Sequence, residues 1–136
     1  MKGVVVTSGL DISVRDFGEP LFKTVGAAVG GDIEHIAPQF LESPFCMIVN
    51  DEGLLRKFPL NIYGSILYGT PMHGVPIVGD VVIMKDGFND NGEPDIVGLT
   101  DQEAAGIMKE AELLLMPYRA KGENKNDQRS QRYSGK

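Results

Sequence analysis

The alternation of hydrophobic and polar positions along the chain predicts a fold rich in short β-strands. Residues 3–7 form an apolar, mostly β-branched run, and residues 12–17 alternate apolar and polar side chains, as a strand with one buried face does. Because Ser8–Asp11 is rich in turn-forming residues, we expect these two strands to form a hairpin. Residues 32–36 alternate in the same way and predict a third strand.

The run Phe45–Val49 has the pattern of a buried strand and is predicted to be the central strand of the sheet. Its five apolar residues are too few for a typical helix, and the polar turn Asn50–Gly53 follows it. Two more strands are predicted over residues 77–84 and 95–99, with a polar, turn-rich loop over residues 85–94 between them. These runs together predict a sheet of about five or six short strands.

Two segments carry an apolar face at helical spacing and predict the main helices. The first covers residues 20–29 and ends at Gly30-Gly31, because glycine commonly terminates a helix. The second covers residues 101–116. Thr100 and Glu103 stand three residues apart at its start, which is the spacing of a capping box.

The order of the predicted elements indicates an α+β fold, because helices and strands do not alternate as repeated βαβ units. We expect a small mixed, mostly antiparallel sheet with two main helices, and a partial barrel is the alternative arrangement. A further short helix over residues 62–68, capped by Asn61, is weakly indicated because it contains Gly64. Residues 1–116 are predicted to form a single domain, and residues 117–136 a polar, basic tail.

The charge of the chain is uneven, and this bears on its partners. The 136 residues carry a formal net charge of −6, but residues 1–116 hold 7 basic and 17 acidic side chains, whereas residues 117–136 hold 6 basic and 2 acidic ones. An acidic body argues against a general nucleic-acid binder. The basic tail remains a candidate for a local contact with phosphate or an acidic partner. Its candidate contact residues are Arg119, Lys121, Lys125, Arg129 and Arg132.

The single cysteine and the short apolar runs bear on location. Cys46 excludes an intramolecular disulfide framework, and its place in an apolar run predicts a buried structural thiol in a reducing compartment. The N-terminal apolar run after Lys2 is too short for a secretory signal, and no run approaches the length that crosses a bilayer. We therefore expect a cytoplasmic protein without a membrane segment.

The polar turn after the predicted central strand is the first candidate ligand site. Asn50, Asp51 and Glu52 offer an amide and two adjacent carboxylates, groups that bind a hard cation or the hydroxyls of a ligand. The alternative interpretation is an ordinary strand turn whose acids face water. His35 and His73 have no clear third ligand, so the sequence predicts neither a metal site nor a cofactor.

The segment from Asn61 to His73 is the preferred candidate ligand site. It combines hydroxyl groups, aromatic rings and glycine, as pockets for small polar ligands often do, and its tyrosine rings are suited to stacking on a base. The alternative is that the rings pack on the sheet with their hydroxyls at the surface. The candidate residues are Asn61, Tyr63, Ser65, Tyr68, Thr70 and His73.

Four short blocks, taken in order, resemble a known family. They are Val29-Gly30-Gly31-x-Ile33-Glu34, Val49-Asn50-Asp51-Glu52-Gly53, Phe58-Pro59-Leu60-Asn61 and Leu99-Thr100-Asp101-Gln102-Glu103. Over roughly residues 1–115 the chain resembles the domain-of-unknown-function family 3846, which is found in bacteria, phages and mobile elements. It departs from the family's usual form at Asp51, Leu54 and Ile62, where Glu, Lys and Arg are common. The resemblance implies the order of elements and a mobile-element setting, and it carries no catalytic residue over.

These observations favour a binding protein over an enzyme. We expect a non-catalytic accessory protein of a phage or mobile element that binds a host protein or a small nucleotide-like ligand and counters host defence. Such a protein would form a homo-oligomer or a tight complex. One alternative is a small hydrolase or transferase that uses Asp51, Glu52 and His73. Another is a nucleic-acid-binding accessory protein that acts through its basic tail.

Overall fold

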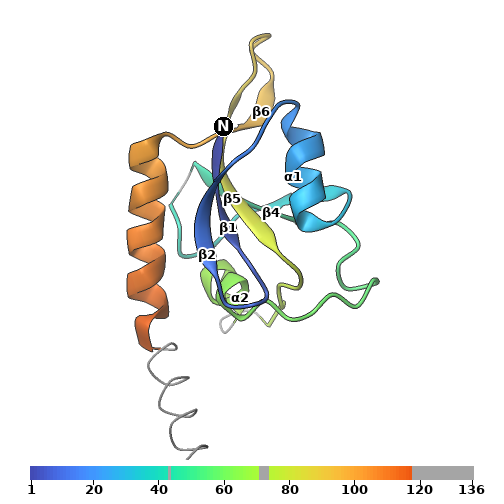
Figure 1. The fold of residues 1–136 in the computed structure, drawn as a ribbon, viewed down its shortest axis with the longest axis vertical. Helices are drawn as coiled ribbons and strands as arrows, with labels where there is room; N and C mark the ends of the chain where they lie inside the picture. The colour runs from blue at the N-terminus through green and yellow to red at the C-terminus, as the bar shows by residue number, and fades with distance from the viewer. Residues whose placement is uncertain (43, 71–73, 118–136) are drawn as a thin grey trace, which may run out of the picture.

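The computed structural model describes residues 1–42, 44–70 and 74–117, which form a six-stranded sheet and three helices (Figure 1). The strands are β1 (Lys2–Val6), β2 (Ile12–Asp16), β3 (Ile33–Ile36), β4 (Phe45–Asn50), β5 (Val81–Phe88) and β6 (Pro94–Val97). The helices are α1 (Leu21–Val29), α2 (Ile62–Tyr68) and a third over residues 101–117. The predicted α+β class is confirmed, and the weakly indicated helix over residues 62–68 forms as α2.

The sheet is open, with the strand order β2-β1-β5-β4-β3, so the partial barrel is not adopted. Each of its strand pairings is antiparallel, including the predicted hairpin of β1 and β2. The central strand is β5, because β1, β4 and β6 all pair with it. The prediction that Phe45–Val49 is central was therefore wrong: β4 lies inside the sheet, between β5 and β3.

The strand predicted over residues 77–84 begins four residues later and extends further. Gly79 takes a left-handed φ of 74°, and its N–H donates to the carbonyl of Pro59 at 2.7 Å. Residues 77–79 thus pair with the segment before α2 instead of with the sheet. Residues 85–88 belong to β5, although a loop was predicted there, because β6 pairs with them.

Helices cover both faces of the sheet, and the core is divided accordingly. Successive residues of a strand point to opposite faces, so Val82 packs with Val25 of α1 on one face. On the other face its neighbour Ile83 belongs to a cluster with Leu67 of α2 and Ile107. Figure 1 shows α1 and helix 101–117 on opposite sides of the sheet, with the β5–β6 hairpin projecting at the top.

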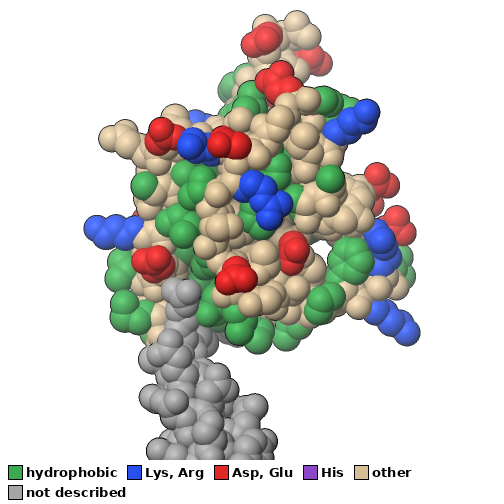
Figure 2. All heavy atoms as spheres, viewed as in Figure 1, with side chains coloured by type: hydrophobic (Ala, Val, Ile, Leu, Met, Phe, Trp, Pro, Cys, Tyr) green, Lys and Arg blue, Asp and Glu red, His purple; other side chains and the backbone are tan. Residues whose placement is uncertain are grey.

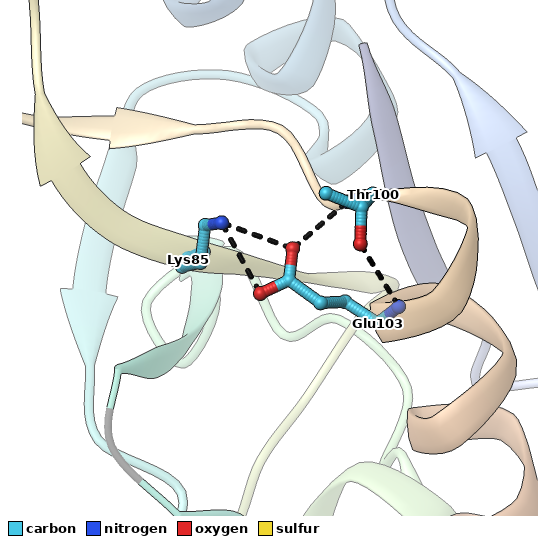
Figure 3. Close-up of polar contacts among 3 residues, drawn as sticks. All are labelled: Lys85, Thr100 and Glu103. Atoms are coloured by element: carbon cyan, nitrogen blue, oxygen red, sulfur yellow. Dashed lines mark hydrogen bonds and ion pairs between the residues drawn. The ribbon is translucent and has the colours of Figure 1, made fainter.

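The start of helix 101–117 carries the predicted capping box (Figure 3). The backbone N–H of Thr100 donates to Glu103 Oε1 at 2.9 Å, and the Glu103 N–H donates to Thr100 Oγ1 at 3.1 Å. Lys85 of β5 donates from Nζ to both carboxylate oxygens of Glu103, at 2.9 and 3.1 Å. The same glutamate therefore caps the helix and ties it to the central strand.

The outer surface mixes charge types. On the face shown in Figure 2, acidic and basic side chains are interspersed with hydrophobic ones. None of the helices in the described part of the chain combines the length and the apolar character that a membrane crossing requires.

Candidate functional site

The predicted turn Asn50–Gly53 is held to the end of α1 by the side chain of Asn50. Its Nδ2 donates to the carbonyl of Val29 at 3.1 Å, and its Oδ1 accepts the N–H of Glu52 at 2.8 Å. Asn50 is buried, whereas Asp51 and Glu52 are exposed. Asn50 thus has a structural role in this turn, and the two carboxylates remain at the surface.

Close packing at the C-terminus of α1 explains the spacing of two of the blocks that carry the family resemblance. Gly30 ends α1 with a φ of 90°, and its carbonyl accepts a hydrogen bond from Arg56 Nη1 at 2.7 Å. The Arg56 guanidinium lies 4.8 Å from the centre of the Phe58 ring. A Cβ at Gly31 would stand 3.2 Å from Asn50 Nδ2. Small residues are therefore needed where the helix end meets the turn.

Asn61 is a completely buried structural residue. Its Nδ2 donates to the carbonyls of Val6 and Gly79, each at 2.8 Å, and its Oδ1 accepts the N–H of Gly64 at 2.7 Å. It therefore caps α2, as predicted, and also joins this helix to β1 and to the bend before β5. The hydrogen-bonding groups of its amide are used within the protein.

The predicted segment from Asn61 to His73 does not converge on one pocket in its described part. Tyr63 and Ser65 are buried, and Ser65 Oγ accepts the N–H of Ile77 at 2.9 Å. Thr70 donates its hydroxyl to the carbonyl of Val75. His73, and with it the predicted group of His73, Asp51 and Glu52, lies outside the described residues.

A hollow beside β3 brings together Asn50, Asp51 and Tyr68 from the two predicted sites. We call it the β3 groove. It has a volume of about 440 Å³ and lies between β3, the end of β4, residues 53–55 and residues 75–78. Its described lining is mostly apolar, and its charged members are Glu34 and Asp51. Two leucines at its rim, Leu54 and Leu55, are 63% and 81% exposed.

A second cluster, which the sequence did not reveal, joins His35, Cys46 and Asp86. His35 Nε2 lies 2.5 Å from Asp86 Oδ1. Burial raises the pKa of the Cys46 thiol to about 12, and Asp86 adds to this shift through its charge and a hydrogen bond. The predicted alternation of β3 correctly separates Glu34, in the β3 groove, from His35 on the other face. The strand register brings Cys46 and Asp86 beside His35, and no local sequence pattern predicts this register.

Comparison with known proteins identifies the family but no characterised relative. No curated protein and no solved structure matches the chain. The family described as Domain of unknown function (DUF3846) matches residues 1–112. This range contains the six strands and the four blocks on which the resemblance rests. The chain therefore belongs to the DUF3846 family.

Proposed function

We propose that this protein is a non-catalytic binding protein that takes an extended peptide segment of a partner protein at the β3 groove. The observation that carries the proposal is the position of the groove beside β3, an edge strand of the sheet. An edge strand offers backbone groups to an added strand, and neighbouring pockets accept every second side chain of that strand. The groove and the edge together provide both kinds of contact.

The backbone of β3 supports pairing with a further strand. The N–H of Asp51 donates to the carbonyl of Asp32 at 2.8 Å. Along an antiparallel pair, the backbone groups of successive residues point alternately toward the partner strand and away from it. The backbone groups of Ile33 and His35 then point away from β4, since these residues stand opposite Asn50 and Ile48. A partner strand would pair with these two residues.

The lining of the groove favours a partner that alternates apolar and basic residues. The described side chains that line the groove are mostly apolar, and Leu54 and Leu55 add exposed apolar area at its rim. Since the charged side chains in the described lining are Glu34 and Asp51, a basic residue fits better than an acidic one. A phosphate-bearing ligand, such as a nucleotide, is less favoured for the same reason.

The family resemblance extends the proposal to a biological setting. We propose that the partner is a host protein and that the chain is an accessory protein of a phage or mobile element which counters host defence. The acidic body of residues 1–116 supports attraction to a basic partner segment. The support for the setting itself is the resemblance alone.

A peptide library tests the groove directly. Synthetic peptides of about ten residues, in which apolar residues alternate with either basic or acidic ones, are measured for binding by fluorescence anisotropy. We expect the basic series to contain the binders. We expect Leu55→Ser to weaken them at least about tenfold, because it removes an apolar contact at the rim without adding a charge. N-methylation of the peptide backbone at the residues that pair with β3 should abolish binding, because it removes the N–H groups that donate to β3.

The control is Leu113→Ser, which changes another exposed leucine on helix 101–117. It should bind peptides like the parent protein. Glu34→Lys should shift the preference from the basic toward the acidic series. Equal binding by the parent protein, Leu55→Ser and Glu34→Lys would contradict the proposal. Binding of ATP instead of peptides, lost in Leu55→Ser, would replace it with the nucleotide-like ligand.

A further inference from the structure

Three side chains with metal-binding atoms meet on the face of the sheet opposite the β3 groove. His35 comes from β3, Cys46 from β4 and Asp86 from β5. His35 stands opposite Ile48, and Cys46 stands opposite Met84. Cys46 lies two residues from Ile48 in β4, and Asp86 lies two residues from Met84 in β5. Residues two apart in a strand point to the same face, so all three side chains share one face. Their ligand atoms all lie within 4.8 Å of one another.

The order of the three groups argues against a catalytic cysteine. A nucleophilic cysteine needs a base beside it, and a third group orients that base. Here Asp86 contacts both His35 and Cys46, so the carboxylate stands where the base would act. A carboxylate next to a thiol disfavours the thiolate, which is the reactive form. The cluster is therefore unsuited to covalent catalysis.

We propose that His35 Nε2, Cys46 Sγ and the Asp86 carboxylate together bind one Zn²⁺ ion. Imidazole nitrogen, thiolate sulfur and carboxylate oxygen are the usual zinc ligands, and three protein ligands leave the fourth tetrahedral position open. On binding, the thiol proton passes to solvent and the sulfur–metal bond forms. The thiolate and the carboxylate then balance the two charges of the ion, which permits its partial burial.

The surroundings allow an ion to enter and the ligands to adjust. His35 and Asp86 line a hollow of about 510 Å³ on this face, together with Phe88 and Ile96. The side chains of His35 and Asp86 are 46% and 52% exposed, so they can change rotamer without unpacking the core. Nitrogen and oxygen bound to the same tetrahedral ion at about 2.0 Å stand roughly 3.3 Å apart. The present contact of 2.5 Å needs to widen by less than an ångström.

Metal titration of the full chain, stripped with a chelator, tests the site. Isothermal titration calorimetry with Zn²⁺ should give one ion per chain. Co²⁺ should give a thiolate-to-cobalt charge-transfer absorption and the intense visible bands of a tetrahedral ion. We expect His35→Ala and Asp86→Asn to weaken Zn²⁺ binding at least about tenfold. Cys46→Ser should abolish the charge-transfer absorption.

The matched control is Glu34→Gln, which changes the neighbouring residue of β3 on the opposite face. It should bind Zn²⁺ and Co²⁺ like the parent protein. His35→Ala and Asp86→Asn change exposed side chains, so circular dichroism should show that both fold, whatever happens to the buried Cys46→Ser variant. Cobalt spectra without the thiolate absorption, or equal Zn²⁺ binding by the parent protein and both exposed variants, would overturn the proposal. Either result would leave peptide binding at the β3 groove unaffected.

Discussion

Two buried asparagines hold the irregular segments of this protein to its sheet. Asn50 joins the turn after β4 to the end of α1, and Asn61 joins the start of α2 to β1 and to the bend before β5. The backbone groups that these amides contact lie at the ends of strands and helices or in the segments between them. Because a buried backbone group without a partner is costly, both side chains help to hold the connecting segments in place.

Replacing Asn61 is expected to be severely destabilising. Asn61→Ala removes partners from the carbonyls of Val6 and Gly79 and from the N–H of Gly64. We expect the free energy of unfolding to fall by about 2 to 4 kcal/mol, measured by urea denaturation. Asn91→Ala, at an exposed turn, should change it by less than about 0.5 kcal/mol. Similar values for the two variants would contradict the role assigned to Asn61.

At the scale of elements, hydrogen bonds and ion pairs at its first turn hold helix 101–117 in place. The capping box of Thr100 and Glu103 satisfies backbone N–H groups that have no partner within the helix. Lys85 joins the same carboxylate to β5, and Lys2 of β1 forms an ion pair with Asp101 at 3.1 Å. The apolar side of the helix then packs on the sheet through Ile107 and its neighbours.

The capping box makes a testable contribution to stability. Thr100→Ala removes the acceptor of the Glu103 N–H. We expect the free energy of unfolding to fall by about 1 kcal/mol, measured by urea denaturation at neutral pH. Thr100→Ser keeps the hydroxyl and should stay within about 0.5 kcal/mol of the parent protein. If Thr100→Ser lowered the free energy of unfolding as much as Thr100→Ala, packing and not the hydroxyl hydrogen bond would be the cause.

The contribution of Glu103 should depend on pH. Hydrogen bonds from Thr100 and Lys85 hold the pKa of Glu103 below its ordinary value. The folded state thus favours the carboxylate, so the stabilisation is complete above the glutamate pKa of the unfolded chain, about 4.3. It is lost as the pH falls through the lowered pKa of the folded state.

Urea denaturation of the parent protein and Glu103→Gln, from about pH 7 to about pH 3, measures this effect. The difference in unfolding free energy should be largest at neutral pH and should shrink below about pH 4. Glu110→Gln changes an exposed glutamate on the same helix and should stay within about 0.5 kcal/mol of the parent protein at neutral pH. A Glu103→Gln difference that is constant with pH would show that charge is not its cause.

At the scale of the whole molecule, segments distant in sequence complete each face of the sheet. α1 covers one face, whereas α2 and helix 101–117 cover the other (Figure 1). The buried hydrophobic residues of the described chain run from Val4 to Leu115. The final helix is therefore part of the core, even though it follows the last strand.

Two truncations test where the folded unit ends. A chain ending after residue 117 keeps every described core residue, and its free energy of unfolding should stay within about 0.5 kcal/mol of the full chain. A chain ending after residue 110 loses Ala111 and Leu115, both of which have no exposed surface. It should lose at least about 3 kcal/mol. Urea denaturation of both proteins measures the difference, and equal stability would contradict the assignment of helix 101–117 to the core.

Local patterns by themselves determined most of the elements and their ends. The alternation of residues 32–36, the apolar run of β4, the Asn61 cap and the Thr100–Glu103 capping box each appear in the structure where the sequence predicts them. Such features depend on side-chain period and on hydrogen bonds between residues a few positions apart. The order along the chain is therefore enough to predict them.

The tertiary structure alone decided which elements became neighbours. β5 is central and begins at Val81 because residues 77–79 pair with the segment before α2. The β3 groove and the His35–Cys46–Asp86 cluster depend on the strand order and on the register of β3, β4 and β5. Side-chain period assigns a residue to one face of its strand but carries no information about which strand lies beside it. Long-range packing supplies that choice, and both candidate sites of this protein are products of it.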